Sequence, residues 1–321
     1  MSTCEWPGVD PELVDRKSRN AFRLRSLLIT LRDDFDGLIL DTEELKNFRV
    51  KITRLDPHAQ ENGVAGQQQF FTPQPLESYQ NLAQPEYKVR SWDYSDIWDS
   101  YDAALGLDLD RRNHLFRTEI PAEKRKPETG LWMADGHAFF DTWHDYKHLS
   151  MGGVVSRHPQ PYWKMQSILF TDPEKKSHPH ALISVCHKFR PNENSDNTVV
   201  RGEILAALNV MHWRIHMTVF GHDELFPILI LSYWGRSARI VQAHFDGVYF
   251  HMALSPFLDF DASNNQEYWD LLARWSLCMP VGDTKVPTNS PVIGTLPALR
   301  ATPSTRWISE GDTKIPKEWP L

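Results

Sequence analysis

Residues 226–234 read FPILILSYW, an almost uninterrupted apolar run. The run is far shorter than the roughly 20 residues of a membrane helix. Its length and composition are typical of a central strand that is buried on both faces of a sheet. The segment 239–245 follows after a short turn and leads to Asp246-Gly247, a dipeptide that favours a two-residue hairpin loop. The sequence therefore predicts an antiparallel hairpin beside a buried central strand.

The predicted hairpin has one apolar and one polar face. A loop made of Asp246 and Gly247 places Ala243 opposite Phe250 and His251 opposite Gln242. The polar face either lines a cleft or is exposed to water. It carries Gln242, His244, Tyr249 and His251.

Further strands and helices surround this hairpin. Residues 162–171 (YWKMQSILFT) and 180–188 (HALISVCHK) predict two neighbouring strands joined by a polar turn. The capping residues 194–197 precede a predicted helix of about 20 residues. Its apolar face is formed by Val200, Ile204, Ala207, Leu208, Met211 and Ile215. Another helix is predicted to begin at Pro11 with Asp10 as its N-cap, and one more to span 265–277.

These elements predict an α/β (or α+β) fold with a mixed central sheet of about five strands over residues 160–255, flanked by helices. Residues 1–279 are expected to form a single compact unit, in which 1–150 make a helical and loop-rich layer and 151–279 make the sheet core. Residues 280–321 contain seven prolines and are expected to form an extended tail.

Composition limits the kinds of partner. The net charge of −7 disfavours binding of nucleic acid through the whole surface, which needs excess Lys and Arg. Three widely spaced cysteines form no disulfide framework, and the N-terminus has no secretory signal. We expect a cytoplasmic protein without a membrane partner, with the nucleus as an alternative. The 12 Trp, 16 Phe and 9 Tyr residues either build the core or line an apolar pocket for a small-molecule ligand.

The strongest candidate for chemistry is the segment 135–148 (DGHAFFDTWHDYKH). On a helix, His137, Asp141, His144 and His148 would share an arc of roughly 60°. Such a face can carry out acid/base chemistry or bind a divalent metal, or it can be the solvated side of an amphipathic helix.

A strand ending in lysine, a long helix and further strands resemble, over residues 162–260, the PD-(D/E)XK nuclease-like modules of uncharacterised fungal proteins. Their catalytic strand reads approximately V-E-x-K, and Val185-Cys186-His187-Lys188 would correspond to it. The resemblance implies a site role for Lys188. It also implies that the metal-binding Glu is replaced by Cys186, and the upstream Asp has its nearest counterpart in Asp172. Because metal-dependent cleavage needs carboxylates, an active nuclease is disfavoured.

Two functions remain open. The first is a small-molecule enzyme of the acid/base type, such as an isomerase, lyase or cyclase, in fungal secondary metabolism. The second is a non-catalytic interaction protein on a degenerate nuclease-like fold. The sequence contains no nucleotide- or phosphate-binding glycine motif, so no organic cofactor is predicted, whereas a divalent metal stays a candidate. The oligomeric state is left open.

Overall fold

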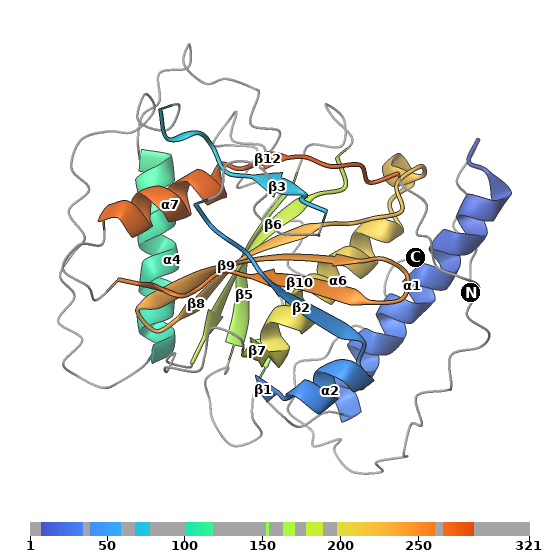
Figure 1. Cartoon of the computed structure of the whole chain (residues 1–321), viewed down its shortest axis with the longest axis horizontal. Coiled ribbons are helices and arrows are strands. Elements are labelled where there is room, and N and C mark those ends of the chain that lie inside the picture. The colour runs from blue at the N-terminus through green and yellow to red at the C-terminus, as the bar shows by residue number, and fades with distance from the viewer. Residues whose placement is uncertain are drawn as a thin grey trace.

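A mixed sheet of eight strands forms the middle layer of the protein, as the computed structural model shows (Figure 1). The structure describes residues 8–34, 39–58, 68–77, 100–117, 152–153, 163–170, 178–188, 198–260 and 266–285. Seven strands follow the order β2-β10-β9-β8-β6-β5-β4, and β11 pairs with β9. Their bounds are β2 Val50–Arg54, β4 Gly152–Gly153, β5 Trp163–Phe170, β6 Ala181–His187, β8 Ile228–Trp234, β9 Ser237–Phe245, β10 Phe250–Leu254 and β11 Leu258–Asp259. The predicted α/β class with a mixed sheet is confirmed.

The sheet is mixed because two of its strand pairs are parallel. β6 lies parallel to β8, and β10 lies parallel to β2, whereas the remaining pairs are antiparallel. The connection from β6 to β8 runs through helix α6 (Arg201–Ile215). Every residue of β6 and β8 is buried, as the apolar run predicted for β8.

Helices cover both faces of the sheet (Figure 1). Helix α1 (Pro11–Ile29) and α6 lie on one face, and α4 (Ser100–Arg117) and α7 (Gln266–Ser276) lie on the other. Side chains of β6 alternate between the two cores: Ile183 and Val185 face α1 and α6, and Leu182 and Cys186 face α4 and α7. We call these the α1–α6 face and the α4–α7 face.

Helix α1 begins where the local sequence predicts it, whereas α6 does not. The Asp10 side chain accepts a hydrogen bond from the Glu12 amide at 2.8 Å, so the predicted cap of α1 is confirmed. Helix α6 is shorter than expected and begins only at Arg201. Its predicted first turn is instead strand β7 (Val199–Val200), which pairs with β1 (Ile39–Leu40).

The hairpin between β9 and β10 forms, but its predicted register is wrong by two residues. Phe245 lies opposite Phe250, and the amide of Asp246 donates to the carbonyl of Tyr249 at 3.2 Å. The loop therefore consists of Gly247, with φ of 91°, and Val248. Asp246 shifts the loop because its Oδ1 accepts from the amides of Val248 and Tyr249, closing the turn after the aspartate. A shift of two residues leaves each side chain on its predicted face.

The N-terminal region contributes more than a helical and loop-rich layer. β2 joins the sheet as a strand, directly after α2 (Thr42–Asn47). β3 (Phe71–Thr72) pairs with β12 (Met279–Pro280), and the Val281 amide donates to the Phe70 carbonyl at 2.9 Å. We call residues 68–72 with 279–285 the strap. The first residues of the predicted tail therefore contact the body of the protein, and residues 286–321 lie outside the described residues.

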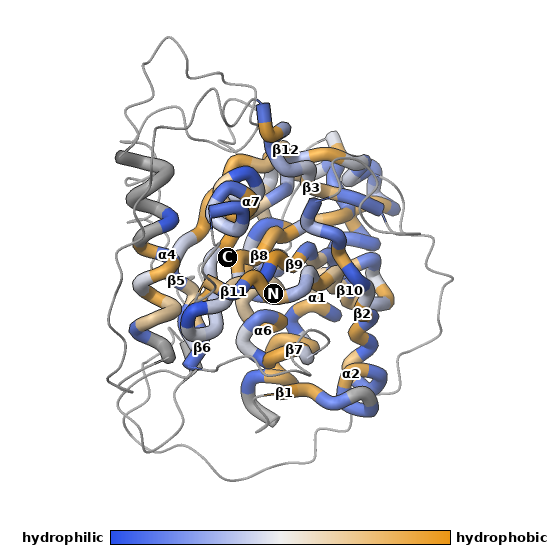
Figure 2. Tube along the Cα trace, turned by 60° about the vertical axis from the view of Figure 1, so that its left-hand side comes forward, coloured by the Kyte–Doolittle hydropathy of each residue, from blue (hydrophilic) through white to orange (hydrophobic). Residues whose placement is uncertain are grey.

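Hydropathy follows this layering. In Figure 2 the strands of the sheet are largely hydrophobic, whereas α2, at the edge of the molecule, is hydrophilic. None of the helices in the described part of the chain has the length and apolarity that spanning a bilayer requires.

Candidate functional site

One row of polar side chains crosses the sheet on its α4–α7 face, at the end where β6, β8, β10 and β2 begin. In the strand register His251 lies opposite His244 on one side and opposite Lys51 on the other. His180 directly precedes β6 and continues the row beyond β8, because Ala181 pairs with Ile228 and Ile228 pairs with Ala243. We call His180, His244 and His251 the histidine row.

A short side-chain contact in this region joins Asp246 and His251. Oδ2 of Asp246 lies 2.8 Å from Nε2 of His251, and the two side chains are 34% and 15% exposed. Burial alone would raise the pKa of Asp246, but hydrogen bonds from His251 and from the amides of Tyr249 and Val248 hold it below its usual value. Asp246 is therefore a carboxylate at neutral pH and holds the ring of His251 in one orientation.

His244 stacks on His251. The two ring centroids are 4.6 Å apart and the rings are within 3° of parallel. Burial, and secondly the neighbouring His251, lowers the pKa of His244 to about 3. The strap covers this ring, since the Phe70 ring lies 4.9 Å from that of His244. His244 is consequently a neutral, desolvated imidazole next to a carboxylate-bound one.

His180 closes the row on the side of β6. Its Nε2 lies 3.0 Å from the carbonyl oxygen of Val281, and its ring contacts those of Phe70 and Phe71 in the strap. Burial lowers the pKa of His180 to about 3 in spite of the hydrogen bond to Val281. The strap therefore holds two of the three imidazoles away from water.

Three buried polar atoms in or beside the row have no hydrogen-bond partner. They are Nδ1 of His180, Nδ1 of His251 and Nε2 of Gln242, whose Oε1 accepts from the Phe70 amide at 3.3 Å. Gln242 and His244 share a face of β9, because they are two residues apart. Unpaired buried polar atoms are rare in folded proteins and often mark functional sites. Together with the Asp246–His251 contact and the stacked rings of His244 and His251, they make this end of the sheet a candidate site.

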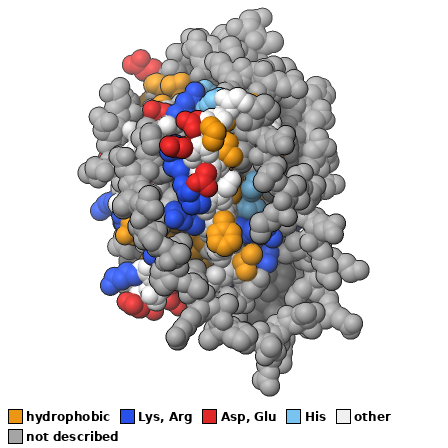
Figure 3. Space-filling view, turned by 90° about the vertical axis from the view of Figure 1, so that its right-hand side faces the viewer, with side chains coloured by type: hydrophobic (Ala, Val, Ile, Leu, Met, Phe, Trp, Pro, Cys, Tyr) orange, Lys and Arg blue, Asp and Glu red, His pale blue; other side chains and the backbone are white. Residues whose placement is uncertain are grey.

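The open side of the row carries a cation. Lys51 is exposed on β2, and its Nζ lies 3.5 Å from the centroid of the Tyr249 ring. This contact keeps a positive charge beside His251 without neutralising it. Figure 3 views the molecule from the right-hand side of Figure 1. In its described part, Lys and Arg side chains lie close together, with histidine and acidic side chains beside them.

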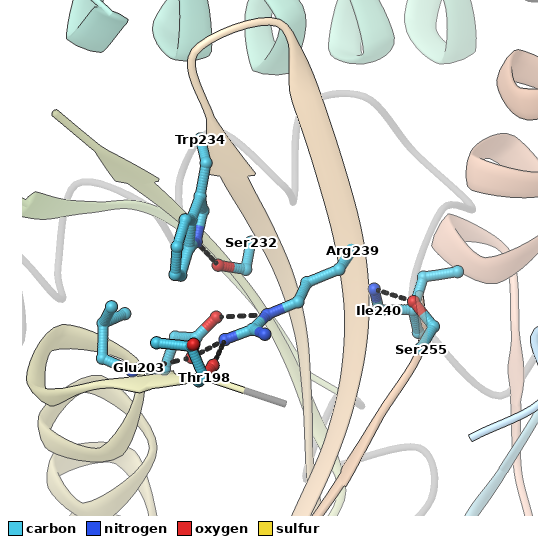
Figure 4. A network of polar contacts seen from close by, with 8 residues as sticks. Thr198, Glu203, Ser232, Trp234, Arg239, Ile240 and Ser255 are labelled. Atoms are coloured by element: carbon cyan, nitrogen blue, oxygen red, sulfur yellow. Dashed lines mark hydrogen bonds and ion pairs between the residues drawn. The ribbon is translucent and has the colours of Figure 1, made fainter. Parts of the chain in front are cut away.

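The predicted site residue Lys188 directly follows β6 and is half-buried, at the opposite end of the sheet. β6 is about 23 Å long at 3.3 Å per residue, so Lys188 and the histidine row cannot share one site. At the same end of the sheet, Arg239 and Glu203 form an ion pair with no exposed side-chain surface (Figure 4). Glu203 accepts from Nε and Nη2 of Arg239 at 2.9 and 2.6 Å, and Nη2 also donates to the Thr198 carbonyl.

Aromatic rings enclose this ion pair. The Arg239 guanidinium lies 4.8 Å from the Trp234 ring and 4.9 Å from the Phe257 ring. Burial, and also the charge of Arg239, lowers the pKa of His187 to about 4, although Glu203 opposes this. Because both oxygens of Glu203 are bonded and the pair is sealed from solvent, this network joins α6 to β9 and is structural.

His137, Asp141, His144 and His148 lie outside the described residues. Among the residues that the structure describes, no group of three or more His, Cys, Asp or Glu side chains is arranged to hold a metal ion. Cys186 is fully buried against the α4–α7 core. The sequence named His244 and His251 as one polar face of the hairpin, but the two-residue register error concealed that their rings stack.

Comparisons with protein-family models, with curated proteins and with solved structures found no match to this chain.

Proposed function

We propose that this protein is a small-molecule enzyme of the acid/base type, in which the Asp246–His251 pair moves a proton. The observation that supports it is the 2.8 Å contact between Oδ2 and Nε2, together with an unpaired Nδ1 on the same ring. A carboxylate that accepts from Nε2–H leaves the lone pair on Nδ1, which makes Nδ1 the base. The same carboxylate stabilises the imidazolium that forms when Nδ1 takes up a proton.

His244 supplies the second group that such a reaction needs. With a pKa of about 3 it is neutral throughout the physiological range, so its ring N–H can donate to a substrate oxygen as negative charge develops there. A base beside a neutral donor suits proton abstraction next to a carbonyl group. This is the first step of many isomerisations and eliminations, so we propose an isomerase- or lyase-type reaction.

Proton abstraction can be tested before the substrate is identified. The purified protein is incubated in D₂O with a panel of small ketones, aldehydes, keto acids and hydroxy ketones, and loss of C–H signals is followed by NMR. We expect catalysed exchange in at least one class of compound. His251→Asn and Asp246→Asn should each lower the exchange rate by about 10²-fold or more, the usual contribution of a positioned base.

His58→Asn serves as the matched control, since it alters an exposed histidine remote from the row. It should leave exchange unchanged. Absence of exchange with every compound, or equal rates in wild type and His251→Asn, would contradict the proposal. The tautomer gives an independent readout: ¹⁵N NMR of His251 should show the proton on Nε2.

A non-catalytic protein on a nuclease-like core is the second candidate. It is favoured by the residues at the carboxyl end of β6, where the metal-binding Glu of the resembled family corresponds to Cys186. The nearby carboxylate of Glu203 is bound on both oxygens by Arg239. Under this alternative no exchange occurs, and substitutions in the histidine row change stability alone.

A further inference from the structure

The carboxamide of Gln242 is held in one orientation by the strap. Its Oε1 accepts a hydrogen bond from the Phe70 amide at 3.3 Å. Because a backbone N–H can only donate, this bond fixes which end of the carboxamide is the oxygen. The Nε2 group has no acceptor within the described part of the chain, although Gln242 is only 6% exposed. Gln242 is therefore a buried, oriented donor with unused hydrogens.

His251 offers the complementary acceptor. The Asp246 carboxylate accepts from Nε2–H of His251, so Nδ1 carries a lone pair, and no donor among the described residues reaches this buried atom. His251 pairs with His244, which is two residues beyond Gln242 on the same face of β9. Gln242 and His251 are thus diagonal neighbours on one face, about 7–8 Å apart. One small molecule can bridge the donor and the acceptor.

Phe70 connects this pair to the rest of the histidine row. Its amide holds Gln242, and its ring lies 4.9 Å from that of His244, which stacks on His251. A ligand between Gln242 and His251 therefore lies under the strap and beside His244. The N–H groups of Gln242 and of the neutral His244 can both donate to one oxygen atom of that ligand.

We infer that the substrate is a small α-hydroxy ketone or α-hydroxy aldehyde, and that Gln242 binds its carbonyl oxygen. The inference rests on the proposed function for the chemical step. The carbonyl oxygen accepts from Nε2 of Gln242, and the hydroxyl group on the next carbon donates to Nδ1 of His251. Such a molecule satisfies both unpaired atoms, whereas a simple ketone satisfies only one of them.

The reaction that this arrangement supports is a redox-neutral isomerisation. Nδ1 of His251 takes the proton from the carbon that bears the hydroxyl group, the electron pair of that C–H bond forms a C=C bond, and the carbonyl π pair moves to oxygen. Gln242 and His244 stabilise the resulting enediolate. The imidazolium then returns its proton to the former carbonyl carbon, and the hydroxyl proton moves to the first oxygen. A hydroxy aldehyde thereby becomes a hydroxy ketone.

Acetohydroxamate is the binding probe, because it resembles the enediolate and carries a carbonyl acceptor beside N–H and O–H donors. It is titrated into the wild-type protein labelled with ¹⁵N in glutamine and histidine. We expect saturable NMR shifts of Nε2 of Gln242 and of Nδ1 of His251. These shifts are measured on the wild type, so they decide the inference even where a variant does not fold.

Gln242→Met removes the donor and keeps the length of the side chain. It should weaken acetohydroxamate binding about tenfold or more and lower the D₂O exchange of hydroxyacetone by about 10²-fold. Gln266→Met is the matched control, since it changes an exposed glutamine of α7, and it should alter neither. Hydroxyacetone should also be accelerated at least about tenfold more than acetone, each relative to its rate in buffer alone.

The outcomes separate this inference from the proposed function. If acetone is accelerated as strongly as hydroxyacetone, the proposed function stands and this inference fails. If acetohydroxamate shifts both signals but no compound exchanges, the donor–acceptor site stands and the proposed function fails. Binding that leaves both signals unchanged, or equal affinity in the wild type and Gln242→Met, overturns the role of Gln242.

Discussion

Acidification to about pH 5 is expected to remove most of the stability of this protein. Burial lowers the pKa of His180 and His244 to about 3 and that of His187 and His212 to about 4. In the unfolded chain a histidine has a pKa of about 6.5. Between these values the unfolded state binds a proton and the folded state does not, so stability is full above about pH 6.5 and falls as the pH drops.

The expected loss is large on the scale of folding. Each such histidine contributes about 1.4 kcal/mol per pH unit, which gives about 2 kcal/mol at pH 5. Four of them sum to about 8 kcal/mol, against a total of about 5–15 kcal/mol for a typical domain. The carboxylates Asp246 and Glu203, whose pKa values lie below their usual range, add nothing in this window, because they titrate only at lower pH.

Urea unfolding at a series of pH values between about 7.5 and 5 measures this loss directly. His180→Gln should reduce the loss by about 2 kcal/mol, because one proton fewer is taken up on unfolding. His58→Gln, which changes an exposed histidine, should behave as the wild type. A free energy of unfolding that stays constant between pH 7.5 and 5 would refute the reasoning, as would an unchanged pH dependence in His180→Gln.

Three further predictions concern stability and can be checked by urea or thermal unfolding. Gly247→Val should destabilise the protein by about 1 kcal/mol or more, since φ is 91° there; an unchanged midpoint would contradict the observed turn. Glu203→Gln should cost about 3–5 kcal/mol, because it leaves Arg239 buried without its counter-charge, and the double variant with Arg239→Met should recover part of the loss. A chain ending at Lys285 should melt like the full chain, whereas one ending at Val281 should lose about 1–3 kcal/mol, because the Thr284 carbonyl accepts from the amides of Glu224 and Leu225.

The sequence predicted those elements whose signal is local. The apolar run of β8 and the cap of α1 are each encoded within a dozen residues and the β5–β6 pair within residues 163–187, and the structure confirms them. β2 and the strap gave no such signal. β2 (VKITR) is a short strand with charged residues, and its pairing with β10 connects residues about 200 positions apart. Its position depends on tertiary contacts that no local pattern encodes.

The candidate site was harder to predict than the fold for a related reason. His180 and His244 lie in one row only because β6, β8 and β9 are neighbours in the sheet. The local sequence around neither histidine specifies that strand order. The contact of His244 with His251 depends on the register, which the Asp246-Gly247 dipeptide specified incorrectly by two residues. The signal that could have corrected it was the aspartate itself, whose side chain closes a turn on the two following amides.

The ion pair at the carboxyl end of β6 and the histidine row at its amino end differ in how their polar atoms are bonded. At the carboxyl end of β6, Glu203 uses both oxygens on Arg239, and aromatic rings seal the pair from water. A polar group whose hydrogen-bond partners all lie inside the protein stabilises the fold and is not available to a ligand. At the amino end, Nδ1 of His251 and Nε2 of Gln242 are buried without partners. An unpaired buried group costs about 1–3 kcal/mol, so under the proposed function a substrate that bonds to these atoms would recover part of that cost.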